Sequence, residues 1–249
     1  TIDGNQAQLT SITATASDTG TSTLTITVDD VVTAAQGASI ANATDAATVN
    51  FSAAGISDAV ANLTDAGDSS TSDNLDLIDA KDADVAITVT DAVTAAQGAS
   101  IADATTGTVD YSAGGVSDTF SNLVNGAGAV SANMGKVDAE DGNVNVTVSD
   151  TIADASAQNI TDLNALLGAT TGTVTATIDG DLAVLDGLTA DTSTPASNAL
   201  TITVDDTIDN ASAAEVTNLN KVLAATAGTV IATIDGNQAQ LTSITATAS

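Results

Sequence analysis

Short runs along the chain alternate apolar and polar residues, and they share one phrase. The phrase reads "LTITVDD" or a close relative, and it occurs four times, at residues 24–30, 85–91, 144–150 and 200–206. Apolar, mostly β-branched side chains take every second position, which is typical of a half-buried β-strand. A second run of the same kind begins at Thr48, Thr108, Thr173 and Thr229. The pattern therefore predicts two strands in each of four repeats.

Between these runs the apolar period changes to that of a helix. "SAAEVTNLNKVL" (212–223) places apolar residues on one helical face, and Ser212 with Glu215 has the spacing of a capping box. "AQNITDLNALL" has the same period, and Thr33–Gln36 and Thr94–Gln97 repeat the capping spacing. Two further sets follow the second strands at i, i+4 and i+7: Ile56, Val60 and Leu63, and Val116, Phe120 and Leu123. We therefore expect one or two helical turns after every strand.

The phrases define an internal repeat. Equivalent residues lie 61, 59 and 56 positions apart, at Ile26, Ile87, Val146 and Ile202. The first seventeen residues are identical to residues 233–249, which gives a superperiod of 232 residues. We expect residues 1–232 to be one superperiod of a longer tandem array. The predicted parts are the end of a preceding repeat at 1–23 and repeats at 24–84, 85–143, 144–198 and 199–249.

The predicted order of strand, helix, strand and helix thus occurs four times. Eight strand–helix turns in 232 residues give about 29 residues per turn, the size of one solenoid coil. Alternating strands and helices favour a parallel sheet. The sequence predicts a repeat solenoid in which short helices flank one continuous parallel β-sheet, with about eight coils per superperiod. The alternative is a string of four small β-sandwich modules, although about 58 residues is short for such a module without disulfides.

The charge of the chain excludes several functions. It has 32 acidic and 3 basic residues, a formal net charge of −29, and neither His nor Cys. Nucleic acid and anionic membrane surfaces need a source of positive charge, so neither is an expected partner. Most nucleophile–base pairs need His or Cys, so we expect no enzyme. No apolar run approaches the roughly 18 residues of a membrane span, so we expect no membrane insertion.

Acidic residues gather near the predicted strand ends and in two polar insertions. Calcium binds six to eight oxygen atoms from carboxylates, carbonyls and amides, so these clusters suggest bound calcium. Asp also caps helices and shapes turns, which leaves a purely structural role open. The strongest candidate cluster is Asp138, Glu140 and Asp141. The other candidate ligands are Asp29, Asp30, Asp79, Asp82, Asp205 and Asp206.

Two other surfaces suggest binding functions. Threonines on the solvent side of stacked strands would form a flat ladder that could bind ice, although Thr is also an ordinary exposed strand residue. The polar insertions at 64–84 and 124–143, which we expect to be irregular, are the natural place for recognition of a glycan or a cell surface. Those insertions contain no aromatic residue, which disfavours a carbohydrate site.

Two long phrases carry a resemblance. "DLNALLGATTGTVTATIDGDLAVLDGLTA" (162–190) and "VTDAVTAAQGASIADATTGTVDYSAGG" (89–115) resemble the Ala/Thr/Asp-rich tandem repeats of very large bacterial, cyanobacterial-type, adhesin-like cell-surface proteins. The resemblance implies an extracellular location and a role in a stalk or filament, with calcium as a further implication. We therefore expect a structural repeat segment that stacks with its own kind. The alternative is a calcium-dependent adhesin module that recognises a surface or glycan.

Overall fold

The computed structural model describes residues 2–9, 25–42, 48–51, 55–65, 70–193, 197–208 and 211–245. Residues 10–24, most of the predicted end of a preceding repeat, lie outside this set. The chain divides into two compact units. The first is Thr1–Val116 with Ala139–Asp141, and the second is Ser117–Asp138 with Gly142–Ser249. The four predicted repeats stay a prediction.

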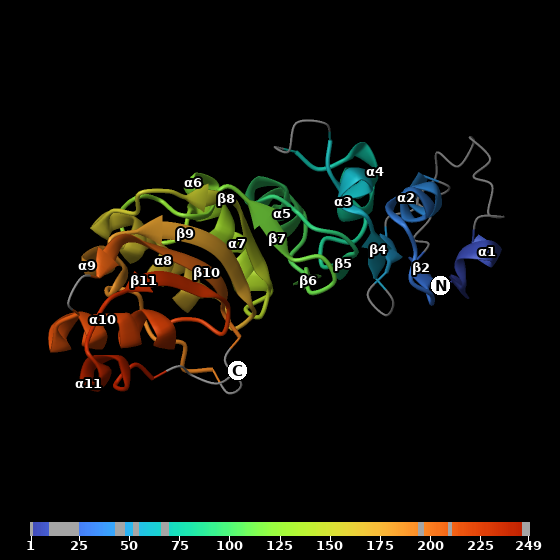
Figure 1. Ribbon diagram of the computed structural model, residues 1–249. Helices are drawn as coiled ribbons and strands as arrows, with labels where there is room; N and C mark the ends of the chain where they lie inside the picture. Colours follow the sequence, from blue (N-terminus) through green and yellow to red (C-terminus); the bar gives the residue numbers. More distant parts are fainter. Residues whose placement is uncertain are drawn as a thin grey trace. The chain divides into compact units, whose positions relative to one another are not determined.

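The described residues contain eleven strands and eleven helices, which largely alternate along the chain (Figure 1). The strands are β1 (Ile2–Gly4), β2 (Thr25–Val28), β3 (Thr48–Asn50), β4 (Ile56–Asp58), β5 (Ile87–Val89), β6 (Val109–Asp110), β7 (Val116–Asp118), β8 (Val146–Ile152), β9 (Val174–Gly180), β10 (Ala199–Ile208) and β11 (Val230–Ile234). The helices are α1 (Gln6–Leu9), α2 (Ala34–Asn42), α3 (Val60–Leu63), α4 (Asp73–Asp79), α5 (Ala95–Asp103), α6 (Phe120–Leu123), α7 (Ala132–Glu140), α8 (Ala157–Ala169), α9 (Leu182–Leu185), α10 (Ala213–Ala224) and α11 (Gln238–Leu241).

The strands pair in parallel, which confirms the predicted parallel α/β class. The described strands form three sheets, with the orders β1-β2-β3, β4-β5-β6 and β11-β10-β9-β8-β7. In the second unit β10 pairs with β9 from Ala199–Thr175 to Val204–Gly180, and with β11 on its other side. Figure 1 shows β9, β10 and β11 as neighbouring strands of one curved sheet. The predicted single continuous sheet is therefore not confirmed, because the described strands form three sheets.

The core is aliphatic, as the scarcity of aromatic residues requires. Along β9 the side chains of Val174, Ala176 and Ile178 are buried, while the threonines between them are exposed. Tyr111 and Phe51 are the largest buried side chains among the described residues, and each directly follows a strand of the first unit. The Tyr111 hydroxyl donates to the carbonyl oxygen of Gly98 at 2.7 Å, so the buried phenol is hydrogen-bonded.

The helix starts with the predicted capping spacing agree with the sequence patterns. Helices α10 and α5 begin with the capping boxes Ser212–Glu215 and Thr94–Gln97. Helix α8 begins with a third capping box, in which Ser156 pairs with Asn159. In each case the helix N-terminus, which otherwise leaves amides without partners, is satisfied by residues of its own first turn.

Two predictions of local structure were wrong. Ile56 and Val116 lie in strands β4 and β7, so only the last two members of each i, i+4, i+7 set are helical. Gly55 and Gly115 precede them with φ of 67° and 69°, a turn that leads a β-branched residue into an extended conformation. The polar insertions, expected to be irregular, contain helices α4 and α7.

Four glycines lie directly against the backbone of a preceding segment: Gly114, before β7, and three that share one type of contact. Gly107, Gly172 and Gly228 come just before β6, β9 and β11. A Cβ atom at these positions would lie 2.3 to 2.4 Å from a main-chain carbonyl oxygen, which is closer than real Cβ atoms come. Because the obstacle is backbone rather than a flexible side chain, only glycine fits there without a shift of the neighbouring strand.

The clash predicts the effect of a Gly172→Ala substitution. We expect it to lower the free energy of unfolding by about 1–3 kcal/mol, the usual cost of overpacking, as measured by urea denaturation. Gly168→Ala is the matched control, because no atom lies within 4 Å of its Cβ position near the end of α8. The control should be neutral or stabilising by about 0.5–1 kcal/mol. Equal effects of the two substitutions would contradict the close approach.

Candidate functional site: contacts between strand–helix segments

A buried threonine connects each of three strands to the strand–helix segment before it. The residues, which we call the Thr bridges, are Thr105, Thr170 and Thr226. The Thr170 hydroxyl donates to the carbonyl oxygen of Val144 at 2.7 Å and accepts from the amide of Gly172 at 2.9 Å. Thr105 and Thr226 make the same pair of bonds in their own segments. The shared sequence is Thr-x-Gly, a repeated signal that the predicted strands and helices did not include.

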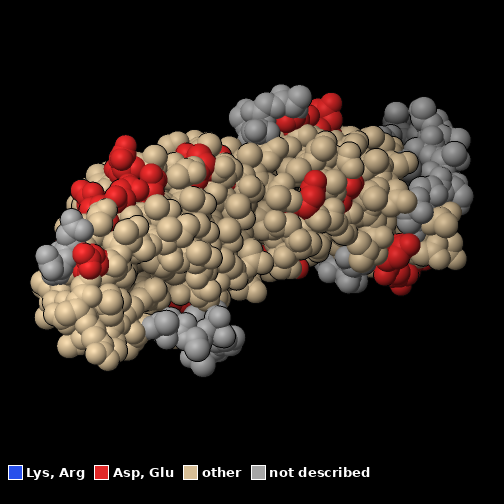
Figure 2. Space-filling view, viewed as in Figure 1, with Lys and Arg blue, Asp and Glu red and all other residues tan. Residues whose placement is uncertain are grey.

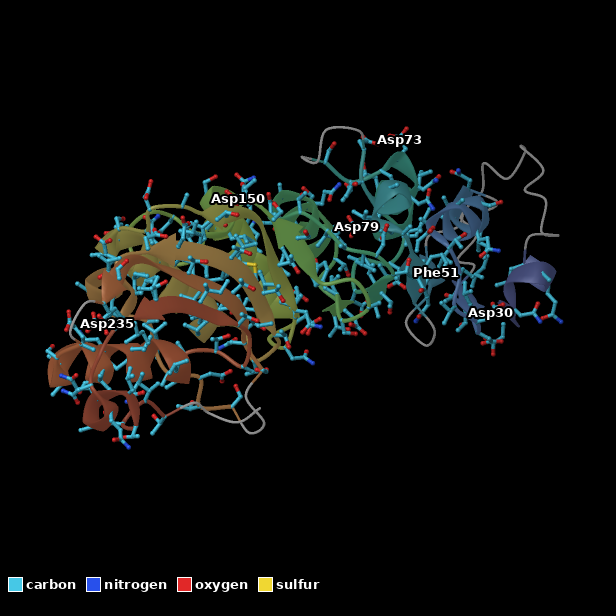
Figure 3. The ribbon with its side chains drawn as sticks, viewed as in Figure 1. Asp30, Phe51, Asp73, Asp79, Asp150 and Asp235 are labelled. Atoms are coloured by element: carbon cyan, nitrogen blue, oxygen red, sulfur yellow. The ribbon has the colours of Figure 1, made fainter. Side chains whose placement is uncertain are left out.

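An aspartate caps each of three short helices from the following segment. These carboxylate caps are Asp91, Asp150 and Asp206, which accept from the first amides of α3, α6 and α9 (Figure 3 labels Asp150). The donor–acceptor distances are 2.7, 2.7 and 2.8 Å. The first turn of a helix has free amides and a partial positive charge, so a carboxylate there is stabilising. Each cap joins residues 24 to 31 positions apart.

In the first unit, acidic residues also bond the amides at strand ends. Oδ2 of Asp82 accepts from the amide of Phe51, and Oδ2 of Asp141 accepts from the amide of Tyr111 at 3.0 Å. Glu140 accepts from the amide of Val109 at 3.3 Å. Burial raises the pKa of Asp82, although its bond to the Phe51 amide acts in the opposite direction. Burial, followed by the charges of Glu140, Asp141 and Asp103, also raises the pKa of Tyr111.

Two asparagines hold loops in the second unit. Asn164 on α8 donates to the carbonyl oxygen of Gly187 at 2.8 Å and accepts from the amide of Thr189 at 2.8 Å. Asn220 on α10 makes the same pair of bonds to Ser243 and Thr245. Each loop follows the next short helix along the chain, α9 or α11. Helices α8 and α10 therefore bind the loops that follow α9 and α11 through the same two hydrogen bonds.

The residues expected to bind calcium are distributed over these structural roles. Asp82, Glu140, Asp141 and Asp206 each bond a backbone amide. Within the described residues, no group of three or more acidic side chains comes together in a way that could hold a metal ion. These carboxylates therefore do not form a ready calcium site, and calcium binding stays a prediction.

The other candidate ligands have different local surroundings. Burial raises the pKa of Asp138 on α7, and its Oδ1 atom is buried without a hydrogen bond. Asp79 lines an open pocket of about 290 Å³ with Asp76 and Asp103. Asp29 and Asp30 follow β2, and loss of hydration, followed by the charge of Asp3, raises the pKa of Asp29. Figure 2 shows the carboxylates of the visible face as separate patches.

Asp205 lies among several carboxylates of the second unit. Loss of hydration and the charges of Asp179, Asp154, Asp181 and Asp206 all raise its pKa. Oδ1 of Asp179, on β9, is buried without a hydrogen-bond partner. Lys221 and Asp186 of the same unit form an ion pair at 3.0 Å, but both side chains are partly exposed, and such pairs contribute less than about 1 kcal/mol. The charged form of Asp205 is therefore disfavoured by both its loss of hydration and the neighbouring carboxylates.

Comparison with known proteins places no restriction on the function. The chain matches no family model, and neither curated proteins nor solved structures give a match. Among the described residues, none of the helices has the length and apolar character needed to cross a bilayer. The function must therefore be inferred from the contacts of this chain.

The Thr bridges predict the effect of a Thr170→Val substitution. Valine keeps the shape but removes the partner of the partly buried Gly172 amide and of the buried Val144 carbonyl oxygen, so we expect a loss of about 1–3 kcal/mol in the free energy of unfolding. Thr175→Val on the exposed side of β9 is the matched control and should be within about 0.5 kcal/mol of the parent. Chemical denaturation measures both. A neutral Thr170→Val would show that the bridge does not stabilise the fold.

The raised pKa of Asp205 predicts a pH-dependent effect. Its charged form is disfavoured in the folded protein, so the penalty is complete above the folded pKa and disappears as the pH falls below about 3.9, the ordinary Asp value. We expect Asp205→Asn to raise the thermal midpoint at pH 7 and to have no effect near pH 3.

Asp206→Ala is the contrasting variant for that experiment. It removes the acceptor of the Leu182 amide and should lower the midpoint at pH 7. Thermal melts followed by circular dichroism at both pH values measure the effects. A lower midpoint for Asp205→Asn at pH 7 would contradict the repulsion.

Proposed function

We propose that the chain is a structural segment of an extracellular filament or giant cell-surface stalk, built by stacking of its repeats into a parallel solenoid. The observation that carries the proposal is the recurrence of the same backbone-directed contacts between successive strand–helix segments. The Thr bridges, the carboxylate caps and the asparagine contacts all join one segment to the next along the chain. Such contacts can continue for as many segments as the chain provides.

The spacing of the contacts supports a solenoid. The carboxylate caps join residues 24 to 31 positions apart, close to the roughly 29 residues of one coil. The strand pairings are parallel, and an isolated parallel bridge joins Val32, just after β2, to Ile56 at the start of β4. A solenoid needs both features, because each coil must present the same face to the coil before and the coil after it.

The composition supports an exposed, stalk-like role. A net charge of −29 keeps neighbouring fibres apart and soluble, while the backbone contacts act along the fibre. The resemblance to adhesin-like repeats points to the cell surface. On this proposal, the partner of each repeat is another repeat, and a surface or glycan ligand is not needed for the stalk to form.

Tandem molecules test the proposal. Chains with one, two and three covalently joined superperiods should show a thermal midpoint that rises with each addition, because every added superperiod buries a further segment boundary. Electron diffraction of the longest molecule should give an axial reflection near 4.8 Å and an axial repeat of about 40 Å per superperiod. A constant midpoint together with separate beads and no axial 4.8 Å reflection would overturn the proposal.

A further inference from the structure

One sequence occurs twice in the described structure, in two different environments. Residues 2–9 and 234–241 are identical and fold alike. Asn5 and Gln8 exchange amide-to-side-chain bonds of 3.1 Å, and Asn237 and Gln240 exchange bonds of 2.8 and 3.2 Å. Any difference in burial between the two copies therefore comes from their neighbours, not from their own conformation.

The last leucine of this sequence shows the difference. Leu9 is 1% exposed, whereas Leu241 is 41% exposed. Around Leu9, β1 pairs with β2 and α1 packs against α2. Leu185, which holds the equivalent place in α9, is fully buried, and there α9 packs against β10 and α10 of the following segment. Leu241 is thus the member of the set that no following segment covers within the described residues.

Strand β11 shows the same incomplete burial. It lies at the end of its sheet, and within the described residues it pairs with β10 alone (Figure 1). Val230, Ala232 and Ile234 are only half-buried. The equivalent residues of β9, which has a strand on both sides, are at most 2% exposed. Strand β11 and helix α11 therefore form an apolar edge, which we call the β11–α11 edge.

We propose that the β11–α11 edge is the docking surface for β2 and α2 (residues 25–42) of a second copy of this chain. The occupant follows from the structure itself, because β2 and α2 already cover the identical sequence at β1 and α1. The inference rests on the proposed function, since it names the partner and the register of stacking between copies. Docking requires the second copy to release its own β1 and α1, which occupy the same edge.

The existing pairing sets the register. β1 pairs with β2 as Ile2–Ile26, Asp3–Thr27 and Gly4–Val28. The docked pairs are therefore Ile234 with Ile26, Asp235 with Thr27 and Gly236 with Val28 of the second copy. The amide of Asp29 donates to the carbonyl oxygen of Gly4 at 3.1 Å, so in the docked pair it donates to that of Gly236.

The carboxylate caps add a further contact. Asp206 ends the second "VDD" phrase and caps the first amide of α9 in the segment before it. Asp30 ends the first "VDD" phrase and holds the equivalent position. In the docked pair, Asp30 of the second copy caps the first amide of α11, at Gln238. Docking thereby repeats two classes of contact seen inside the chain, the parallel strand pairing and the carboxylate cap.

Charge repulsion opposes the docking, so the strength of association should depend on the salt concentration. Both copies carry a net charge of −29, and Asp235, labelled at the end of β11 in Figure 3, comes close to Asp29 of the second copy by this register. Salt screens exposed charges, with a Debye length of about 30 Å at 0.01 M and about 8 Å at 0.15 M. Association of the full chain should therefore strengthen at least tenfold between these two ionic strengths.

Cysteine cross-linking tests the register in a chain that has no native cysteine. Asp235→Cys and Thr27→Cys variants of the full chain are mixed and oxidised, and the products are separated on a non-reducing gel. We expect the mixed dimer to form at least tenfold more than with the control pair Asp235→Cys and Thr175→Cys. Thr175 is also an exposed strand threonine, but it lies inside the sheet. Equal yields for the two pairs would overturn the register.

A reversible lock tests the release of β1. The double variant Asp3→Cys, Thr27→Cys joins β1 to β2 within one chain when oxidised, because these residues are paired. Sedimentation velocity should show the oxidised chain as a monomer and the reduced chain as an associating species. Unchanged association after oxidation would overturn the exchange of β1.

A substitution at Leu241 tests the apolar contact at the β11–α11 edge. Leu241→Asp should weaken association at least tenfold, whereas Leu77→Asp, at an exposed leucine of α4, should not. Equal association of these two variants would overturn the role of the β11–α11 edge. A parent chain that stays monomeric at millimolar concentration would overturn docking between separate copies. The stalk proposal fails on different grounds, in the covalently joined tandem molecules, so the two failures are distinguishable.

Discussion

The backbone groups at the ends of strands and helices must be satisfied by side chains from the neighbouring segment. Strands of two to ten residues, and helices of which five have only four residues, leave many amides and carbonyl oxygens without partners of their own. Thr170 and Asp206 show the solution, because each places an oxygen on main-chain groups of another segment. Without these oxygens the short elements could not be buried, since an unsatisfied buried polar group costs about 1–3 kcal/mol.

The same constraint explains the composition. A core with few aromatics gains less from each buried side chain, so hydrogen bonds between segments have a larger share in fixing the arrangement. Aspartate suits the helix ends because its charge matches the partial positive charge of the first turn. The cost is loss of hydration together with repulsion between carboxylates, and both raise the pKa of Asp205. The acidic character of the chain is thus partly a structural requirement.

Much of the fold could be predicted from the sequence, because period two and period 3.6 are local signals. Strands β2 and β10 and the capping box at Ser212 appeared where the sequence predicts them. Ile56 was misplaced because its spacing to Val60 fits a helix, whereas it lies in β4, and the extended Ala59 separates β4 from α3. The roles of the carboxylates could not be predicted from the sequence for another reason. Asp82 bonds the amide of Phe51, 31 residues away, and no local pattern shows such a pairing.

The contacts between segments are directed at backbone rather than at particular side chains. Every residue type except proline offers the same amide, so a carboxylate cap does not depend on which residue begins the helix it caps: Val60, Phe120 and Leu182 serve equally. Segments of different length and sequence are therefore interchangeable parts. A gene encoding such a chain can gain, lose or diversify whole segments, and each new boundary still finds a matching partner.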